Sequence, residues 1–94
     1  MTVIALLTLD IEIPHAQSLK DKRMIVRRVK DRLRSKFNVA VAEVDYQHLW
    51  QRSQLSVVTV GPDEAYLNQM LQHALEETER SVPECTVQGN VEIV

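Results

Sequence analysis

The sequence is poor in the residues that build disulfide frameworks, phosphate loops and stacking surfaces. Its 94 residues include one cysteine, two glycines, one tryptophan, one phenylalanine and two tyrosines. A lone cysteine excludes an internal disulfide, which is typical of proteins kept in a reducing compartment. Two isolated glycines exclude a glycine-rich phosphate loop. We therefore expect a cytoplasmic protein that does not bind nucleotides through such a loop.

Membrane and catalytic signals are also missing. The apolar runs are too short and too interrupted to cross a bilayer, and the first residues lack the basic region and cleavage site of a signal peptide. His15, His48 and His73 have no metal-ligand spacing, and no histidine stands near Cys85 in the sequence. We expect no metal site, no cofactor, no catalytic residue and no membrane association, and hence a protein that is not an enzyme.

Charge is abundant but unevenly placed. The segment 19–37 holds nine of the eleven lysines and arginines against two aspartates, a local charge of +7, although the whole chain carries −2. The remaining residues carry −9. A strongly cationic element on an acidic body attracts polyanions through its local field, so this segment indicates a binding surface.

Hydrophobic periodicity predicts six elements. Residues 3–13 alternate as a strand with one buried face; residues 38–45, 52–60 and 85–94 form three further strands. Ser18 is a good N-cap with Asp21 three residues later, which predicts a helix over 19–37. Pro62 or Asp63 begins a second helix that ends near Arg80, with Glu76, Glu77 and Glu79 on its outer face.

This order predicts one α+β domain spanning residues 1–94. The βαββαβ sequence of elements, with right-handed crossovers, packs most simply as a ferredoxin-like sandwich. Such a sandwich has a four-stranded antiparallel sheet with two helices on one face. Alternation then places Ile4, Leu6, Val58 and Val60 on the open face of the sheet, where an apolar patch favours a homodimer.

The cationic helix contains one continuous basic stripe. Spacings of three and four residues align its members over about 21 Å at 1.5 Å rise per residue. The stripe comprises Lys20, Arg23, Arg27, Lys30 and Arg34. Basic helices of this kind commonly meet phosphate backbones, but a solvated face neutralised by acids on neighbouring elements has equal weight. Arg28, Arg32 and Lys36 lie on the opposite flank.

The topology also brings the start of this helix to the loop between the second and third strands. Lys20 and Arg52 flank the helix N-terminus near Trp50, which is an arrangement suited to an anion. The alternative is structural: Trp50 covers the core and Arg52 pairs with Glu43 or Asp45. No aromatic residue lies on the predicted central strands, so contact with nucleic acid would depend mainly on backbone charge.

Three segments in order resemble the bacterial DUF503 (YlxP-like) family. They are Ser18-Leu19-Lys20-Asp21-Lys22-Arg23, the run from Phe37 to Asp45, and Trp50-Gln51-Arg52. The resemblance covers nearly the whole chain and implies a ferredoxin-like domain; it carries no established activity. In many bacteria genes of this family lie beside the ribosome-binding factor A gene, which implies a link to RNA or the ribosome. The family often has an acid two residues before the tryptophan, where this chain has His48.

We therefore expect an RNA- or ribosome-associated binding protein whose basic helix contacts phosphates. The site residues expected are Lys20, Arg23, Arg27, Lys30, Arg34, Trp50 and Arg52. The alternative is a dimeric protein-interaction or small-anion-binding module that does not bind nucleic acid.

Overall fold

The computed structural model describes all 94 residues. Its elements follow the order β1 (Val3–Glu12), α1 (Leu19–Lys36), β2 (Ala40–Asp45), β3 (Arg52–Gly61), α2 (Glu64–Ser81) and β4 (Thr86–Ile93). The predicted number, type and order of elements are confirmed. Neither helix is long and apolar enough to span a membrane.

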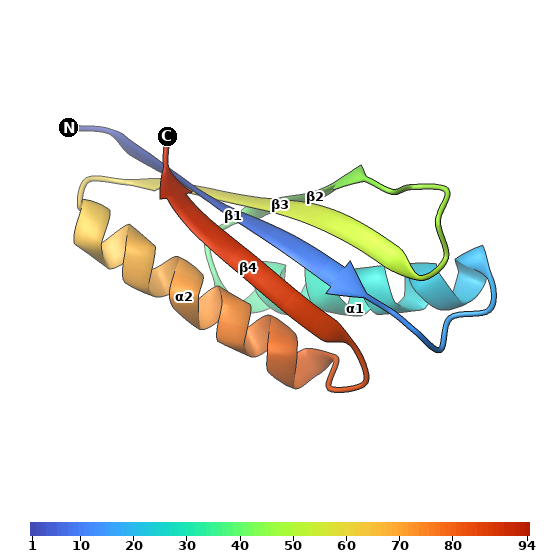
Figure 1. The fold of residues 1–94 in the computed structure, drawn as a ribbon. Coiled ribbons are helices and arrows are strands. Elements are labelled where there is room, and N and C mark those ends of the chain that lie inside the picture. Colours follow the sequence, from blue (N-terminus) through green and yellow to red (C-terminus); the bar gives the residue numbers. More distant parts are fainter.

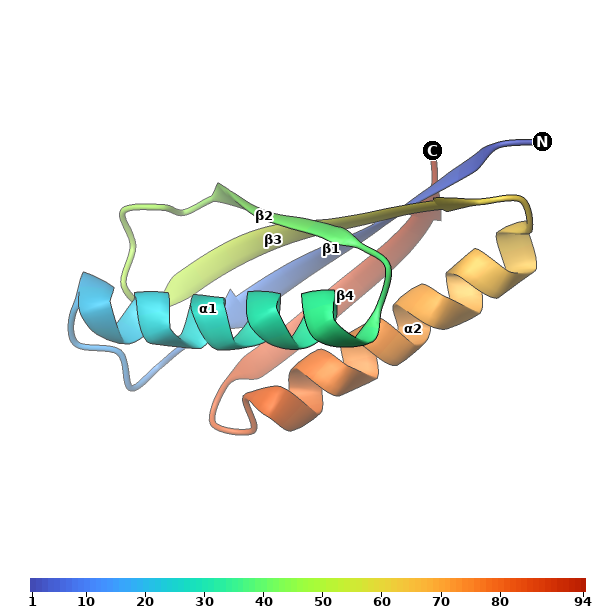
Figure 2. The same cartoon turned by 180° about the vertical axis from the view of Figure 1, so that it is seen from behind.

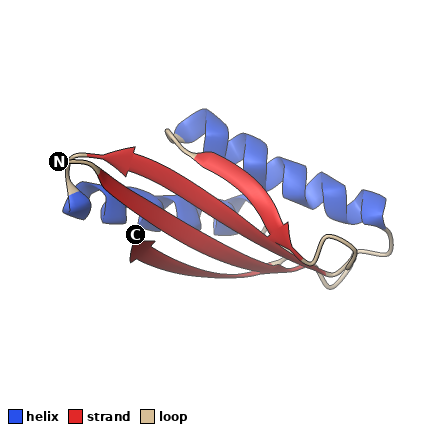
Figure 3. Ribbon diagram, turned by 90° about the horizontal axis from the view of Figure 1, so that it is seen from above, coloured by secondary structure: helices blue, strands red, loops and turns tan.

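The strands form one antiparallel sheet in the order β2-β3-β1-β4. Both helices lie against the same face of this sheet (Figure 1), and the other face is uncovered when viewed from above (Figure 3). This arrangement is the predicted ferredoxin-like sandwich. Because β2 is an edge strand, α1 runs beside the border of the sheet with one flank open.

The period-two alternation of β1 determines which of its residues enter the core. Every second side chain from Val3 to Ile11 is buried, and these residues pack within a core of 18 apolar residues. The residues between them face the open side, where Ile4 pairs with Val60 and Leu6 pairs with Val58. The predicted register is thereby confirmed, and Ile4 and Val60 remain 40% and 57% exposed.

Side-chain caps set where both helices begin. The backbone N–H of Asp21 donates to Ser18 Oγ at 3.0 Å, as the sequence predicted. The Asp21 carboxylate accepts from the N–H of Gln17 at 3.0 Å, one residue before the position expected for a capping box. Asp63 caps α2 by accepting from the N–H groups of Ala65 and Tyr66.

Candidate functional site

The nine basic residues of α1 divide into three groups with different surroundings. One group faces α2 and the loop that follows it, where acids neutralise its cations. Arg28 Nη1 lies 2.9 Å from Glu84 Oε2, Arg32 Nε lies 3.2 Å from Glu77 Oε1, and Lys36 Nζ lies 2.7 Å from the same oxygen. On this flank the predicted neutralisation by acids of a neighbouring element is therefore correct.

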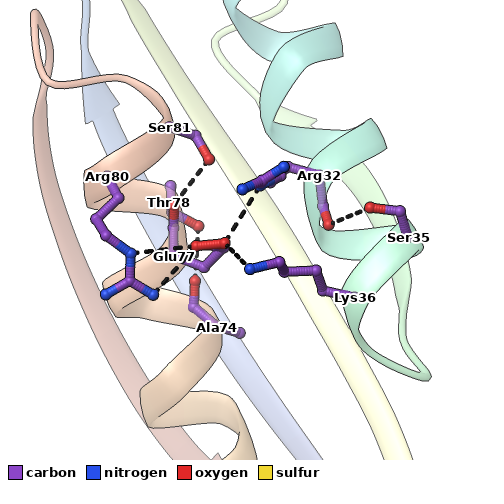
Figure 4. Close-up of polar contacts among 8 residues, drawn as sticks. All are labelled: Arg32, Ser35, Lys36, Ala74, Glu77, Thr78, Arg80 and Ser81. Atoms are coloured by element: carbon purple, nitrogen blue, oxygen red, sulfur yellow. Dashed lines mark hydrogen bonds and ion pairs between the residues drawn. The ribbon is translucent and has the colours of Figure 1, made fainter.

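Glu77 is the acid that joins the two helices, and the prediction that it points outward is wrong. Its side chain is only 2% exposed, because α1 packs against this turn of α2. Besides the two cations of α1, Arg80 Nη2 lies 3.1 Å from Oε2 (Figure 4). The hydrogen bond from Lys36 is the largest cause that lowers the pKa of Glu77 to about 2, and Arg80 adds to it against the opposing effect of burial.

Lys22 forms the second group alone. Its side chain is 2% exposed, and its ammonium lies 3.0 Å from Glu43 Oε2 on β2. The same ammonium donates to the backbone carbonyl of Tyr46, and Ser53 Oγ donates to Glu43 Oε2 at 2.6 Å. The sequence predicted that the Lys22 stem lies on the core; the structure buries the charged end as well. This network ties the first turn of α1 to the end of β2.

The third group is the predicted basic stripe. None of its five members has a carboxylate within 4.0 Å. Four of them line a groove of about 370 Å³ between α1 and the β2 side of the sheet. These four are Arg23, Arg27, Lys30 and Arg34. Lys20 lies one turn closer to the helix start and is exposed.

The basic groove, as we call this hollow, carries a net positive charge. Its lining has five cations, the fifth being Lys22, against the carboxylates of Asp31 and Glu43, which gives +3. Arg34 Nη2 donates to the backbone carbonyl of Val41 at 2.9 Å, so one cation is held against the edge strand. Like charges at three- and four-residue spacings repel one another, and no carboxylate forms an ion pair with Arg23, Arg27 or Lys30 that would offset this cost directly.

The loop between β2 and β3 reaches the start of α1, as predicted from the topology (Figure 2). The N–H of Ile13 donates to the carbonyl of Gln51 at 2.9 Å. The side-chain amide of Gln51 donates to the carbonyls of Pro14 and Ala16, both at 3.1 Å. These bonds fasten the loop to the segment that connects β1 to α1.

Arg52 does not pair with Glu43 or Asp45, which corrects the structural alternative. Its nearest carboxylate is Asp10, at 3.8 Å on the neighbouring strand, and its guanidinium lies 4.3 Å from the centre of the Tyr46 ring. The register explains the difference for Glu43, which lies opposite Leu55 on the face that the helices cover and is bound there by Lys22, whereas Arg52 lies opposite Glu12 on the open face. No interaction joins Arg52 to Lys20, and the start of α1 is already capped by the side chains of Ser18 and Asp21.

Trp50 does not cover the core. It is 50% exposed and lines a second hollow of about 490 Å³ within the same loop. The loop turns at Tyr46, whose φ of 63° is a left-handed conformation that few residues other than glycine adopt. The Asp45 carboxylate accepts from the Tyr46 N–H at 2.7 Å and supports this turn.

Cys85 stands apart from these groups. Partial burial, followed by the nearby charge of Glu84, raises the pKa of its thiol to about 11. A protonated thiol is a poor nucleophile and a poor metal ligand.

Sequence reasoning missed the contribution of Glu43 and Gln47 to the groove. Glu43 occupies an inward position of β2, and a charged residue at such a position indicates that a partner is buried with it. That signal was present in the alternation. Gln47 lines the groove directly after the left-handed turn at Tyr46, which no local pattern in the sequence predicts.

Together these features define a small ferredoxin-like protein with one neutralised and one unpaired flank on its basic helix. The chain belongs to the family described as "Protein of unknown function (DUF503)", which it matches over residues 4–88. It is also 37% identical over 60 residues to "Uncharacterized protein YlxP" of Bacillus subtilis (strain 168). That alignment spans 64% of this chain and 65% of the relative, just under two thirds of its length.

Solved structures share the fold at low sequence identity. A de novo designed protein with a ferredoxin fold, LFR1 1, has a TM-score of 0.60 at 17% identity, over 98% of this chain and 85% of its own. A C-terminal segment of the alpha subunit of aIF2 from Pyrococcus abyssi has a TM-score of 0.56 at 19% identity. It covers 96% of this chain and 49% of its own. At these identities the likeness establishes the fold alone.

Proposed function

We propose that this protein is a non-catalytic, cytoplasmic RNA-binding protein that associates with RNA or the ribosome through its basic groove. The observation that carries the proposal is the division of charge along α1. Arg32 and Lys36 are paired with Glu77 of α2, and Arg28 is paired with Glu84 of the loop after α2, whereas the stripe that lines the groove has no such acid partner. Holding α1 to α2 and its following loop is a structural role for the first group. Arg34 is hydrogen-bonded to β2, but Arg23, Arg27 and Lys30 have no ion pair that would give them a structural role.

The groove suits a phosphate backbone for a geometric reason. Arg23 and Arg34 are eleven residues apart, so the lining cations extend over about 17 Å of helix. The four cations form a row on one side of α1, and phosphates bind to such a row without base recognition. The gene neighbourhood implied by the family resemblance supports the same class of ligand.

The test is co-sedimentation with ribosomes and with ribosomal RNA across a salt series. If the four lining cations each neutralise one phosphate of a single strand, log K falls against log salt with a slope of about −3. Binding then weakens roughly 50-fold between 50 and 200 mM salt.

A matched pair of double variants separates the groove from charge in general. Arg27→Gln with Lys30→Gln removes two groove cations, and the salt slope should become shallower by about 1.4. Arg28→Gln with Arg32→Gln removes the same charge from the flank that faces α2 and should leave the slope unchanged. Equal weakening by both pairs, with both proteins folded by circular dichroism, would remove the groove from the proposal.

We propose a second copy of the chain as the partner of the open sheet face. Ile4 beside Val60 and Leu6 beside Val58 form an uncovered apolar strip on that face. Sedimentation velocity should then give a dimer that Val60→Asp dissociates. A monomer at high micromolar concentration contradicts this proposal, and a dimer that binds no RNA at any salt concentration favours the protein-interaction alternative.

A further inference from the structure

We infer that the basic groove takes single-stranded RNA and that Trp50 stacks on an unpaired base at the end of the bound strand. The inference rests on the proposed function and names the form of RNA that the site accepts. It depends on where the loop between β2 and β3 presents its one indole ring.

The stacking surface adjoins the phosphate surface. Gln47 lines the groove, and His48, the next residue, lines the hollow that contains Trp50. The two hollows are therefore lined by consecutive residues of this loop. A strand whose phosphates follow α1 from Arg34 toward Arg23 reaches this loop with its terminal nucleotide.

The loop holds Trp50 in a defined place while leaving its ring available. On one side Lys22 donates to the carbonyl of Tyr46, and the N–H of Leu49 donates to the same carbonyl at 3.0 Å. On the other side Gln51 is hydrogen-bonded to the end of β1 and to the segment that follows it. Because these bonds fix the backbone on both sides of Trp50 before any ligand is bound, a base that packs on the half-exposed ring does not have to order the loop as well.

The geometry selects against a duplex. Bases inside an RNA helix are stacked on one another and present only their edges, so a side chain at the end of the groove meets no open base face. An unpaired base offers that face, and base–aromatic stacking tolerates any sequence. His48 and Arg52 line the same hollow and supply polar and cationic groups beside the ring.

Trp50 is the only tryptophan of the chain, so its fluorescence reports on this position alone. Titration with an RNA octamer should quench the emission and saturate together with the anisotropy of the labelled octamer. Trp50→Ala should weaken binding of the labelled octamer by about 5- to 150-fold and leave the salt slope unchanged. Trp50→Phe should restore part of the loss, and duplex RNA of equal length should give no quenching.

The matched control is Tyr66→Ala, because Tyr66 is a similarly exposed aromatic residue, 61% exposed, on α2. This variant should bind the octamer as the unmodified protein does. Two results would overturn the inference and leave the proposed function standing. One is salt-sensitive binding of the octamer that Trp50→Ala leaves unchanged, and the other is tighter binding of the duplex than of the octamer. Absence of binding to every RNA at low salt would overturn both.

Discussion

Replacing the buried Lys22 by methionine tests whether the ion pair under the groove holds the first turn of α1 to β2. Methionine keeps most of the apolar stem that the core surrounds and removes only the ammonium. Glu43 then retains Ser53 as a donor but loses its charge partner, and the carbonyl of Tyr46 loses a donor.

The expected cost follows from the burial of the two partners. Removal of one member of a buried ion pair costs about 3–5 kcal/mol. Glu43 is 20% exposed, so water can partly solvate the stranded carboxylate, which places the expected loss at the lower end, about 3 kcal/mol. For a domain of this size the melting temperature should fall by roughly 12–24 °C.

Urea denaturation of three variants measures the pair. Lys22→Met and Glu43→Gln each leave one group without its partner, whereas the double variant leaves neither charge stranded. The double variant should therefore be more stable than Lys22→Met alone by at least about 1 kcal/mol. A loss of less than about 1 kcal/mol for Lys22→Met, or strictly additive losses in the double variant, would refute the reasoning.

Three further predictions concern single groups. The pKa of Glu77 is lowered from 4.5 to about 2, so its ionisation stabilises the fold fully above pH 4.5 and this contribution is lost as the pH falls toward 2. The urea midpoint of the unmodified protein should therefore decline more steeply between pH 4.5 and 2 than that of Glu77→Gln. Parallel declines of the two proteins would contradict the prediction. Because the pKa of the Cys85 thiol is raised to about 11, iodoacetamide should alkylate Cys85 much more slowly at pH 8 in the folded protein than in the urea-unfolded chain. Equal alkylation rates in the two states would contradict this prediction. Ser18→Ala removes the cap on the N–H of Asp21 and should cost about 1 kcal/mol of unfolding free energy, while Ser18→Asp should retain most of it.

The fold follows almost entirely from local patterns. The alternation from Val3 to Glu12, the caps at Ser18 and Asp63, and the break at Gly61-Pro62 predict the elements to within a few residues. The DUF503 family was identified from motifs that lie at the start of α1, across β2 and at the start of β3. The site was predicted less completely, because its members come from α1 and from a loop about twenty residues further along the chain.

What the sequence alone determined is the amount of positive charge on α1 and its arrangement at helical spacing, since 3.6 residues per turn places the stripe on one side. Only the tertiary structure decided which of those charges are free. Glu77 was predicted to face solvent, yet the contact of α2 with α1 buries it among three cations. Lys22 and Glu43 were brought together by the packing of α1 against β2, and the loop between β2 and β3 leaves Trp50 half exposed. Such outcomes depend on contacts between distant segments, and no periodicity within one segment encodes them.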